Sequence, residues 1–140
     1  MSRGKIFITF TEDAISAFYK EALKQPFFEF MELASKDHSD DCRPDVMRYF
    51  LVKGLLAAES NRNSIQELMT KADKNARIFQ GENQRITFRH TTKLFTRMES
   101  VFEDESWQNS INNLELGGVL SNRGPKSWPK ILVFIGFSSI

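Results

Sequence analysis

The densest group of possible metal ligands lies in one short polar stretch of the chain, His38-Ser39-Asp40-Asp41-Cys42. Imidazole, carboxylate and thiolate groups are the usual ligands of zinc, and carboxylates are those of calcium. The spacing of these residues matches no common zinc or calcium pattern, however, and His90 is the only other histidine. The stretch is therefore predicted to be a solvated loop with a helix-capping aspartate, and neither a metal nor another cofactor is expected.

Cys42 is the only thiol in the chain, so it is the only candidate for a cysteine nucleophile. A nucleophile needs a base within hydrogen-bonding reach, and His38 and His90 are the two imidazoles that could serve. The sequence contains neither the nucleophile elbow of hydrolases nor a glycine-rich phosphate-binding loop. The chain is therefore predicted not to be an enzyme. A single cysteine also excludes an internal disulfide and fits a reducing compartment.

Four cations follow one another at a regular spacing of four residues, with no acidic residue between them: Arg85, Arg89, Lys93 and Arg97. On a helix this spacing places them in one positive line, a basic ridge. The ridge is either a solvated face or a binding surface. As a binding surface it would contact an acidic partner helix or nucleic acid. Because the formal net charge is only +1, nucleic acid is not expected as the main partner. A small helical nucleic-acid-binding or regulatory module that uses this ridge is the alternative function.

The elements that must position these residues are predicted to be helices. The chain has 140 residues, 41% of them hydrophobic, which suits one domain with a single core. The predicted fold class is all-α with six or seven helices, and strands at 5–10 or 130–137 would be marginal. Segment 45–58, apolar on nearly all sides, is expected in the middle of the bundle. The first predicted helix follows a Thr11 cap and extends to Leu23. Apolar residues recur at helical spacing in this helix and in the later predicted segments. These later segments are 27–34, 45–58, 65–78, 88–103, 107–120 and 127–137.

The predicted helices at 88–103 and 107–120 meet at an acidic corner, Glu103-Asp104-Glu105. Apolar side chains line both sides of this corner, and none of them is an acid, a base or a nucleophile. They form either ordinary core or the two sides of a helix-binding groove, so binding is favoured over catalysis. These side chains are Phe95, Met98 and Phe102 on the first helix and Ile111, Leu114 and Leu116 on the second.

This corner resembles the Bcl-2 family of apoptosis regulators, particularly the short divergent members carried by large DNA viruses. In the family's first homology motif an apolar helix ends in Phe and an acidic residue, and a Trp then opens a central helix that contains Gly-Gly. Segments 68–73 and 128–136 resemble the third and second motifs in the family's order, so the resemblance covers residues 64–137. The positions that match the first motif, with one residue missing before the Trp, are Phe102, Glu103, Asp104, Trp107, Ile111, Leu114, Leu116, Gly117 and Gly118.

A second alignment of the first motif begins at Trp128. Residues 128–137 keep the motif's apolar spacing and place Lys130 two residues after the Trp. The family has an arginine at that position, which pairs with the aspartate of the bound partner helix, whereas the Trp107 alignment has Asn109 there. On the Trp128 alignment the chain would end inside the family's central helix. The Trp107 alignment is therefore kept as the prediction for the start of the central helix, and the Trp128 alignment is the alternative.

The resemblance implies a Bcl-2-like bundle of six to eight helices around a central apolar helix, acting as a viral inhibitor of apoptosis. Such a protein holds the amphipathic death-signalling helix of a pro-apoptotic partner in a hydrophobic groove. Because Asn109 has no charge, it cannot pair with the partner's aspartate. Either Arg97 or Arg89 makes this ion pair instead, or the ion pair is absent. Without the ion pair only helices with strong apolar anchors would bind, so a narrow partner range is expected. The resemblance places in or beside the groove Arg89, Arg97, Met98, Val101, Phe102, Trp107, Asn109, Ile111, Leu114, Leu116, Gly117 and Gly118.

No apolar stretch of the sequence is long enough to span a bilayer, and the N-terminal run is too short for a secretory signal. The chain is therefore predicted to be soluble and intracellular. The resemblance implies the host-cell cytoplasm, with peripheral contact at mitochondria and no stable membrane anchor. A groove rich in Phe and Met exposes apolar surface that favours self-association, so a two-fold homodimer is predicted.

Overall fold

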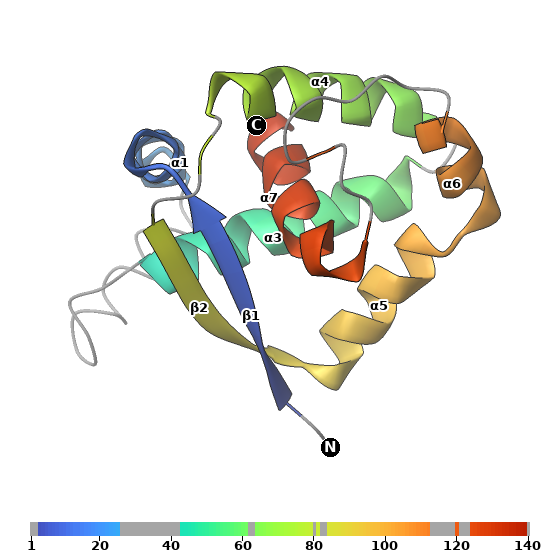
Figure 1. The fold of residues 1–140 in the computed structure, drawn as a ribbon, viewed down its shortest axis with the longest axis horizontal. Helices are drawn as coiled ribbons and strands as arrows, with labels where there is room; N and C mark the ends of the chain where they lie inside the picture. The colour runs from blue at the N-terminus through green and yellow to red at the C-terminus, as the bar shows by residue number, and fades with distance from the viewer. Residues whose placement is uncertain are drawn as a thin grey trace.

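The computed structural model describes residues 3–25, 43–61, 64–79, 81, 84–112, 120 and 124–139. Several sequence predictions lie outside this part of the chain: the helix at 27–34 and the group from His38 to Cys42, as well as Leu114, Leu116 and the Gly117-Gly118 pair. Most of the described residues are helical, which confirms a mainly helical fold. The small sheet lies at one side of the molecule, and the helices pack around one deeply buried helix (Figure 1).

The helices begin and end where the sequence supplies caps and breakers. The side chain of Thr11 accepts a hydrogen bond from the backbone N of Ala14 at 3.1 Å and so caps α1. Thr91 caps α5 in the same way through the backbone N of Leu94. A short 3-10 turn, Pro125–Ser127, leads into α7. The α-helices are α1 (Glu12–Leu23), α3 (Arg43–Ser60), α4 (Ile65–Ile78), α5 (Thr92–Phe102), α6 (Glu105–Asn112) and α7 (Trp128–Ser138).

Two strands, β1 (Arg3–Phe10) and β2 (Gln84–Thr91), form an antiparallel sheet that the all-α prediction lacked. The predicted helix at 88–103 is wrong in its first turn, because the chain is a strand as far as Thr91. In β2, Ile86 is buried between exposed Arg85 and Thr87, which is the alternation of a strand with one face on the core. Local periodicity could not show this strand, since its hydrogen-bonding partner lies some eighty residues earlier in the chain.

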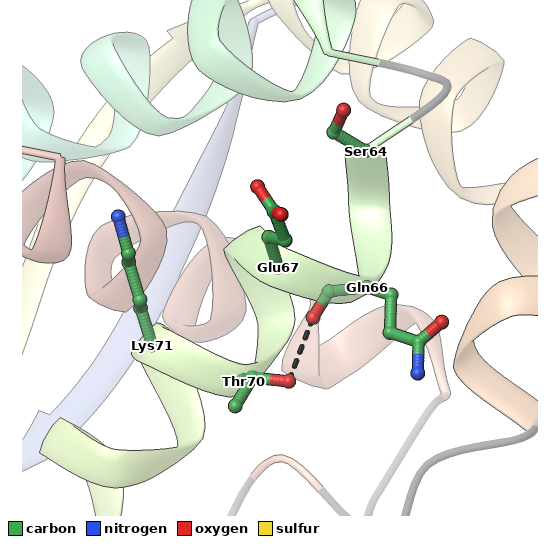
Figure 2. Close-up of a pocket in the computed structure, with 5 residues that line it drawn as sticks. All are labelled: Ser64, Gln66, Glu67, Thr70 and Lys71. Carbon is green, nitrogen blue, oxygen red and sulfur yellow. Dashed lines mark hydrogen bonds between the residues drawn. The ribbon is translucent and has the colours of Figure 1, made fainter.

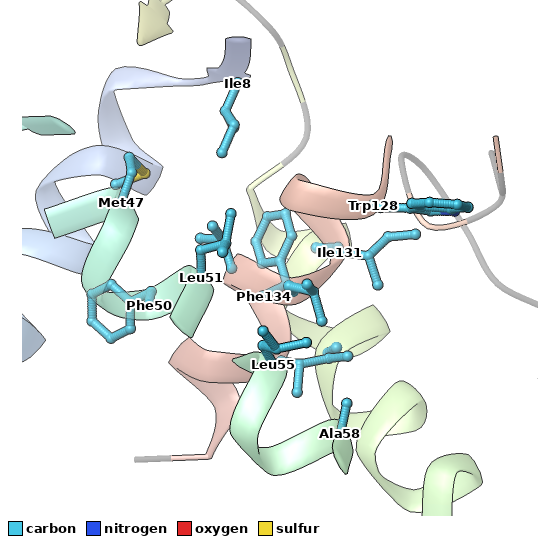
Figure 3. Close-up of a cluster of buried hydrophobic side chains, with 14 of the residues drawn as sticks. Ile8, Met47, Phe50, Leu51, Leu55, Ala58, Trp128, Ile131 and Phe134 are labelled. Atoms are coloured by element: carbon cyan, nitrogen blue, oxygen red, sulfur yellow. The ribbon is translucent and has the colours of Figure 1, made fainter. Parts of the chain in front are cut away.

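The most deeply buried helix is α7, in which every residue from Trp128 to Gly136 is buried. It packs along α3 and also against α4 (Figure 3). The predicted central segment, 45–58, lies in α3 and leaves Val52 and Leu56 exposed on its outer side. Of the two tryptophans considered for the start of the central helix, Trp128 therefore opens the buried helix, whereas Trp107 lies in the short peripheral helix α6.

Phenylalanine rings fill the centre of the core, as the high Phe content of the sequence requires. Phe18 of α1 lies within ring-centroid distances of 5.0 Å from Phe10, 5.7 Å from Phe50 and 5.8 Å from Phe134. These four rings come from β1, α1, α3 and α7, and all are fully buried. Edge-on and tilted packing of this kind adds stability beyond simple burial. The cluster therefore joins the sheet to three helices.

Candidate partner-binding site

The corner between α5 and α6 is held by hydrogen bonds that the side chains of Asp104 and Gln108 make with the backbone. One carboxylate oxygen of Asp104 accepts from the backbone N of Ser106 at 2.9 Å and from that of Trp107 at 3.4 Å. The Gln108 side chain donates to the backbone oxygen of Phe102 at 2.8 Å and ties α6 back to the end of α5. An aspartate at a helix start satisfies N–H groups that would otherwise lack a partner. The corner is thus a turn whose helix start is capped by Asp104.

Phe102 contacts both tryptophans of the chain. Its ring lies edge-on to Trp107, with centroids 5.0 Å apart and planes at 68°. It is stacked on Trp128, again at 5.0 Å, with the planes at 5°. All three side chains are buried. Phe102 therefore links the two tryptophans, which come from α6 and α7.

A cavity of about 130 Å³ opens beside these three rings. Cavities of similar size in proteins accept a benzene ring, so there is room for one aliphatic or aromatic side chain. The exposed side chains of Gln108 and Asn112 lie at its rim. A smaller void beneath the corner is bordered by Ile65, Val101, Asp104 and Trp107. The side chains that line the main cavity are Phe102, Trp107, Gln108, Ile111, Asn112 and Trp128.

The structure brings three of the predicted groove residues, Phe102, Trp107 and Ile111, together at this cavity. Val101 borders the smaller void, and Met98 is buried but lines neither space. Asn109 is exposed on α6 and does not line the cavity. Sequence reasoning did not include Trp128, Gln108 or Asn112 in the site. The similarity of the Trp128 segment to the first motif was the signal that could have placed Trp128 there.

The buried indole N–H of Trp107 has no hydrogen-bond partner among the described residues. Trp107 itself is only 2% exposed, so this donor is shielded from solvent. A buried donor without a partner costs free energy. Trp107 borders both the cavity and the smaller void, so the corner combines apolar walls with one polar group that is not satisfied by the described part of the chain.

The basic ridge predicted from the sequence is wrong as a single helical line. Arg85 and Arg89 lie on β2, whereas Lys93 and Arg97 lie on α5, because Thr91 ends the strand and caps the helix. The Arg97 guanidinium is also already paired: its Nε donates to Glu59 at 2.9 Å, and a second nitrogen bonds the other carboxylate oxygen. This hydrogen bonding, followed by the attraction between the charges, raises the pKa of Arg97 above its ordinary value. Arg97 is thus engaged with α3.

Because the Arg97–Glu59 pair lies near the surface, with 41% of the Arg97 side chain exposed, its contribution to stability should be small. We expect Arg97→Gln to lower the free energy of unfolding by less than about 1 kcal/mol. Urea denaturation at low and at high salt measures this, and high salt should shrink the difference. Glu59→Gln is the matched variant and should give a similar loss. A loss of several kcal/mol from either variant would contradict the surface assignment.

A second hollow lies on the outer face of α4 (Figure 2). It is wide, about 780 Å³, and the side chains around it are all exposed and polar. The Thr70 hydroxyl donates to the Gln66 backbone oxygen at 2.8 Å and so is satisfied within the helix. In the described part of the chain no buried or aromatic side chain borders this hollow, and we assign no site there. Its border is formed by Ser64, Gln66, Glu67, Thr70 and Lys71.

Comparison of the chain with protein-family models, with curated proteins and with solved structures finds no match. Within the described part of the chain, no group of three or more His, Cys, Asp or Glu residues is placed to hold a metal ion. No helix in that part is both long and apolar enough to cross a membrane.

Proposed function

We propose that this chain is a Bcl-2-like inhibitor of apoptosis, of the divergent type that large DNA viruses carry. In this proposal it sequesters the amphipathic death-signalling helix of a pro-apoptotic partner at the cavity beside Phe102. The observation that supports it most is the meeting of Phe102, Trp107 and Trp128 around a space of side-chain size. Helix-in-groove recognition uses such spaces for single apolar anchors of the bound helix.

The arrangement of the helices supports the Trp128 alignment within this proposal. α7 opens at Trp128, is apolar throughout its first nine residues and packs against α3 and α4. A Bcl-2-like bundle has one helix of this kind at its centre. In the Trp107 alignment the central helix would be α6, which has only eight described residues and buries Trp107 and Ile111 alone. Within this proposal we therefore take Trp128 as the family's tryptophan, in place of the Trp107 predicted from the sequence, and residues 128–136 then correspond to the first motif and no longer to the second.

Charge at the cavity supports a narrow partner range. None of the described side chains that line it is a cation, and Arg97 is paired with Glu59. On the Trp128 alignment the family's cation position is Lys130, but this residue is buried, and its ammonium lies 4.9 Å from the centroid of the Phe10 ring. The partner's aspartate would then gain no ion pair at this site. Affinity would depend on apolar burial, at about 25 cal/mol per Å², so only helices with strong apolar anchors should bind.

Filling the cavity should abolish binding of such a helix. We expect Asn112→Trp, which places a large ring at the rim, to weaken binding of a labelled death-signalling helix at least tenfold. Asn109→Trp is the matched control, since Asn109 is equally exposed on α6 but lies outside the cavity, and it should change the affinity less than twofold. Fluorescence polarisation with a panel of pro-apoptotic helices measures both.

Three outcomes of that titration would count against the proposal. Equal weakening by the Asn112 and Asn109 variants would show that the cavity is not the binding site. Binding of the whole panel with similar affinity would contradict the narrow partner range. No binding by the unmodified chain would contradict the groove itself. Thermal unfolding of each variant separates loss of binding from loss of fold.

The homodimer and the cytoplasmic, mitochondria-associated location remain predictions that belong to this proposal. The exposed apolar side chains that would favour self-association include Val52 and Leu56 on α3 and Phe95 on α5. A two-fold dimer would bury the same patch on both copies. Sedimentation at high protein concentration distinguishes such a dimer from a monomer.

A further inference from the structure

The two strands concentrate positive charge in a chain that is nearly neutral as a whole. Together β1 and β2 contain four Arg and Lys residues and no Asp or Glu. The complete chain has 18 acidic residues and a formal net charge of +1. Such a local excess of one sign produces a field that attracts polyanions even when the net charge is small. The four cations are Arg3, Lys5, Arg85 and Arg89.

The strand register places an exposed aromatic ring between two of these cations. Phe7 is directly opposite Thr87, which lies midway between Arg85 and Arg89 on β2. Residues at even spacing share a face of a strand, so both arginines lie on the outer face with Thr87. Their Cα atoms are roughly 13 Å apart at the usual rise per residue. Lys5 is the register partner of Arg89.

Phe7 and Arg85 stack on one another on this outer face, and this pair is called the Phe7–Arg85 platform. The guanidinium carbon of Arg85 lies 4.1 Å from the centroid of the Phe7 ring, within the range of a cation–π contact. Phe7 nevertheless remains 51% exposed, so much of the ring still faces solvent. Neither Arg85 nor Arg89 has a carboxylate partner among the described residues. The surface therefore offers a partly exposed ring with one cation stacked on it, and a second exposed cation, Arg89, four residues along the same strand.

From this geometry we infer that the outer face of the β1–β2 sheet binds single-stranded nucleic acid. A base stacks on the Phe7–Arg85 platform, and the phosphates on either side contact Arg85 and Arg89. Aromatic stacking combined with a basic surface is the general mode by which proteins hold single strands without reading their sequence. This inference is independent of the proposed helix-binding cavity: the strands lie on the left of Figure 1, whereas α6 lies at its far right.

Two other polyanionic surfaces fit this face less well. A lipid membrane is held by several apolar side chains that insert together, but Phe7 is the only exposed large apolar side chain described on the two strands. Duplex nucleic acid keeps its bases stacked internally, so it offers no free base to the platform. A single strand supplies both a base for the ring and phosphates for the arginines.

The inference is tested by polarisation titrations of the full chain with a fluorescein-labelled strand of twelve thymidines, repeated at several salt concentrations. Phe7→Leu should weaken binding about tenfold while leaving the salt dependence unchanged, because it removes stacking and no charge. The double variant Arg85→Gln/Arg89→Gln should weaken binding and reduce the slope of log K against log salt by about 1.4, or about 0.7 per lost phosphate contact. Thermal unfolding confirms that each variant remains folded.

The matched control is Lys20→Gln/Lys74→Gln, which removes the same charge from exposed positions on α1 and α4. This variant should weaken binding less than twofold. Equal weakening by the lysine and arginine pairs would show that only bulk charge matters and would overturn the inference. It would also be overturned by absence of binding, by equal affinity for a twelve-base-pair duplex, or by binding to anionic phosphatidylserine vesicles but not to the strand.

Discussion

Replacing Gly54 by alanine is expected to lower the free energy of unfolding by at least about 3 kcal/mol, although alanine is the better helix former. Gly54 lies in α3 where its backbone meets that of α7. A Cβ added there would fall on the carbonyl oxygen of Leu132 and lie 2.7 Å from its carbonyl carbon. Backbone atoms cannot rotate away as a side chain can, so the two helices would have to separate.

Gly136 makes the same contact from the opposite side. A Cβ there would fall on the carbonyl oxygen of Phe50 and lie 2.9 Å from the backbone N of Gly54. The two glycines thus allow α3 and α7 to touch along their backbones. Overpacking in a core usually costs about 1–3 kcal/mol, and a clash with backbone belongs at or above the top of that range. We expect Gly136→Ala to be as harmful as Gly54→Ala.

The sign of the Gly54→Ala effect makes the experiment decisive. In an exposed helix, alanine is more stable than glycine by about 1 kcal/mol, so a helix without this close contact would gain stability. Urea denaturation followed by far-UV circular dichroism measures the difference. Ser16→Ala, on the exposed side of α1, is the control and should stay within about 0.5 kcal/mol of the unmodified chain. A stabilised Gly54→Ala variant would show that the two backbones do not meet there.

Helical periodicity predicted most helices well, because their apolar faces are local features of the sequence. The segment predicted at 65–78 is the helix Ile65–Ile78, and that at 45–58 lies within Arg43–Ser60. Strand β2 was missed because a spacing of four residues is compatible with both kinds of element. Arg85 and Arg89 share a face on a helix, and they also share one on a strand because four is even. Only the pairing with β1, distant in sequence, decides between the two.

The candidate site likewise contains a contact between segments that are distant in the sequence, which local patterns do not predict. Phe102, Trp107 and Ile111 are close in sequence and could be placed around one corner from their spacing alone. Trp128 reaches the same cavity only because α7 is buried in the middle of the molecule. The sequence predicted that segment 45–58 would be the helix in the middle of the bundle, because this segment is apolar on nearly all sides. Segment 128–136 is also strongly apolar. Exposure of Val52 and Leu56 on α3 shows that apolar composition alone does not identify the most buried helix.

The ring of Phe18 is expected to be the single side chain whose loss costs most in the aromatic core. It is fully buried, and its centroid lies 5.0 Å from Phe10 and 4.9 Å from Phe137, with Phe50, Phe79 and Phe134 also in ring contact. Phe18→Ala should lower the free energy of unfolding by about 4 kcal/mol, from lost burial and from the cavity left behind. Because domains of this size are stable by only about 5–15 kcal/mol, such a loss would remove a large fraction of the total stability.

Two further variants separate the aromatic contribution from simple burial. Phe18→Leu keeps most of the apolar volume and loses only the ring contacts, so we expect a loss of about 1.5 kcal/mol. Phe95→Ala removes a ring that is 37% exposed on α5 and should cost well under half as much as Phe18→Ala. Urea denaturation followed by tryptophan fluorescence and circular dichroism gives all three values. Equal losses for Phe18→Ala and Phe95→Ala would mean that α1 does not anchor the core through this ring.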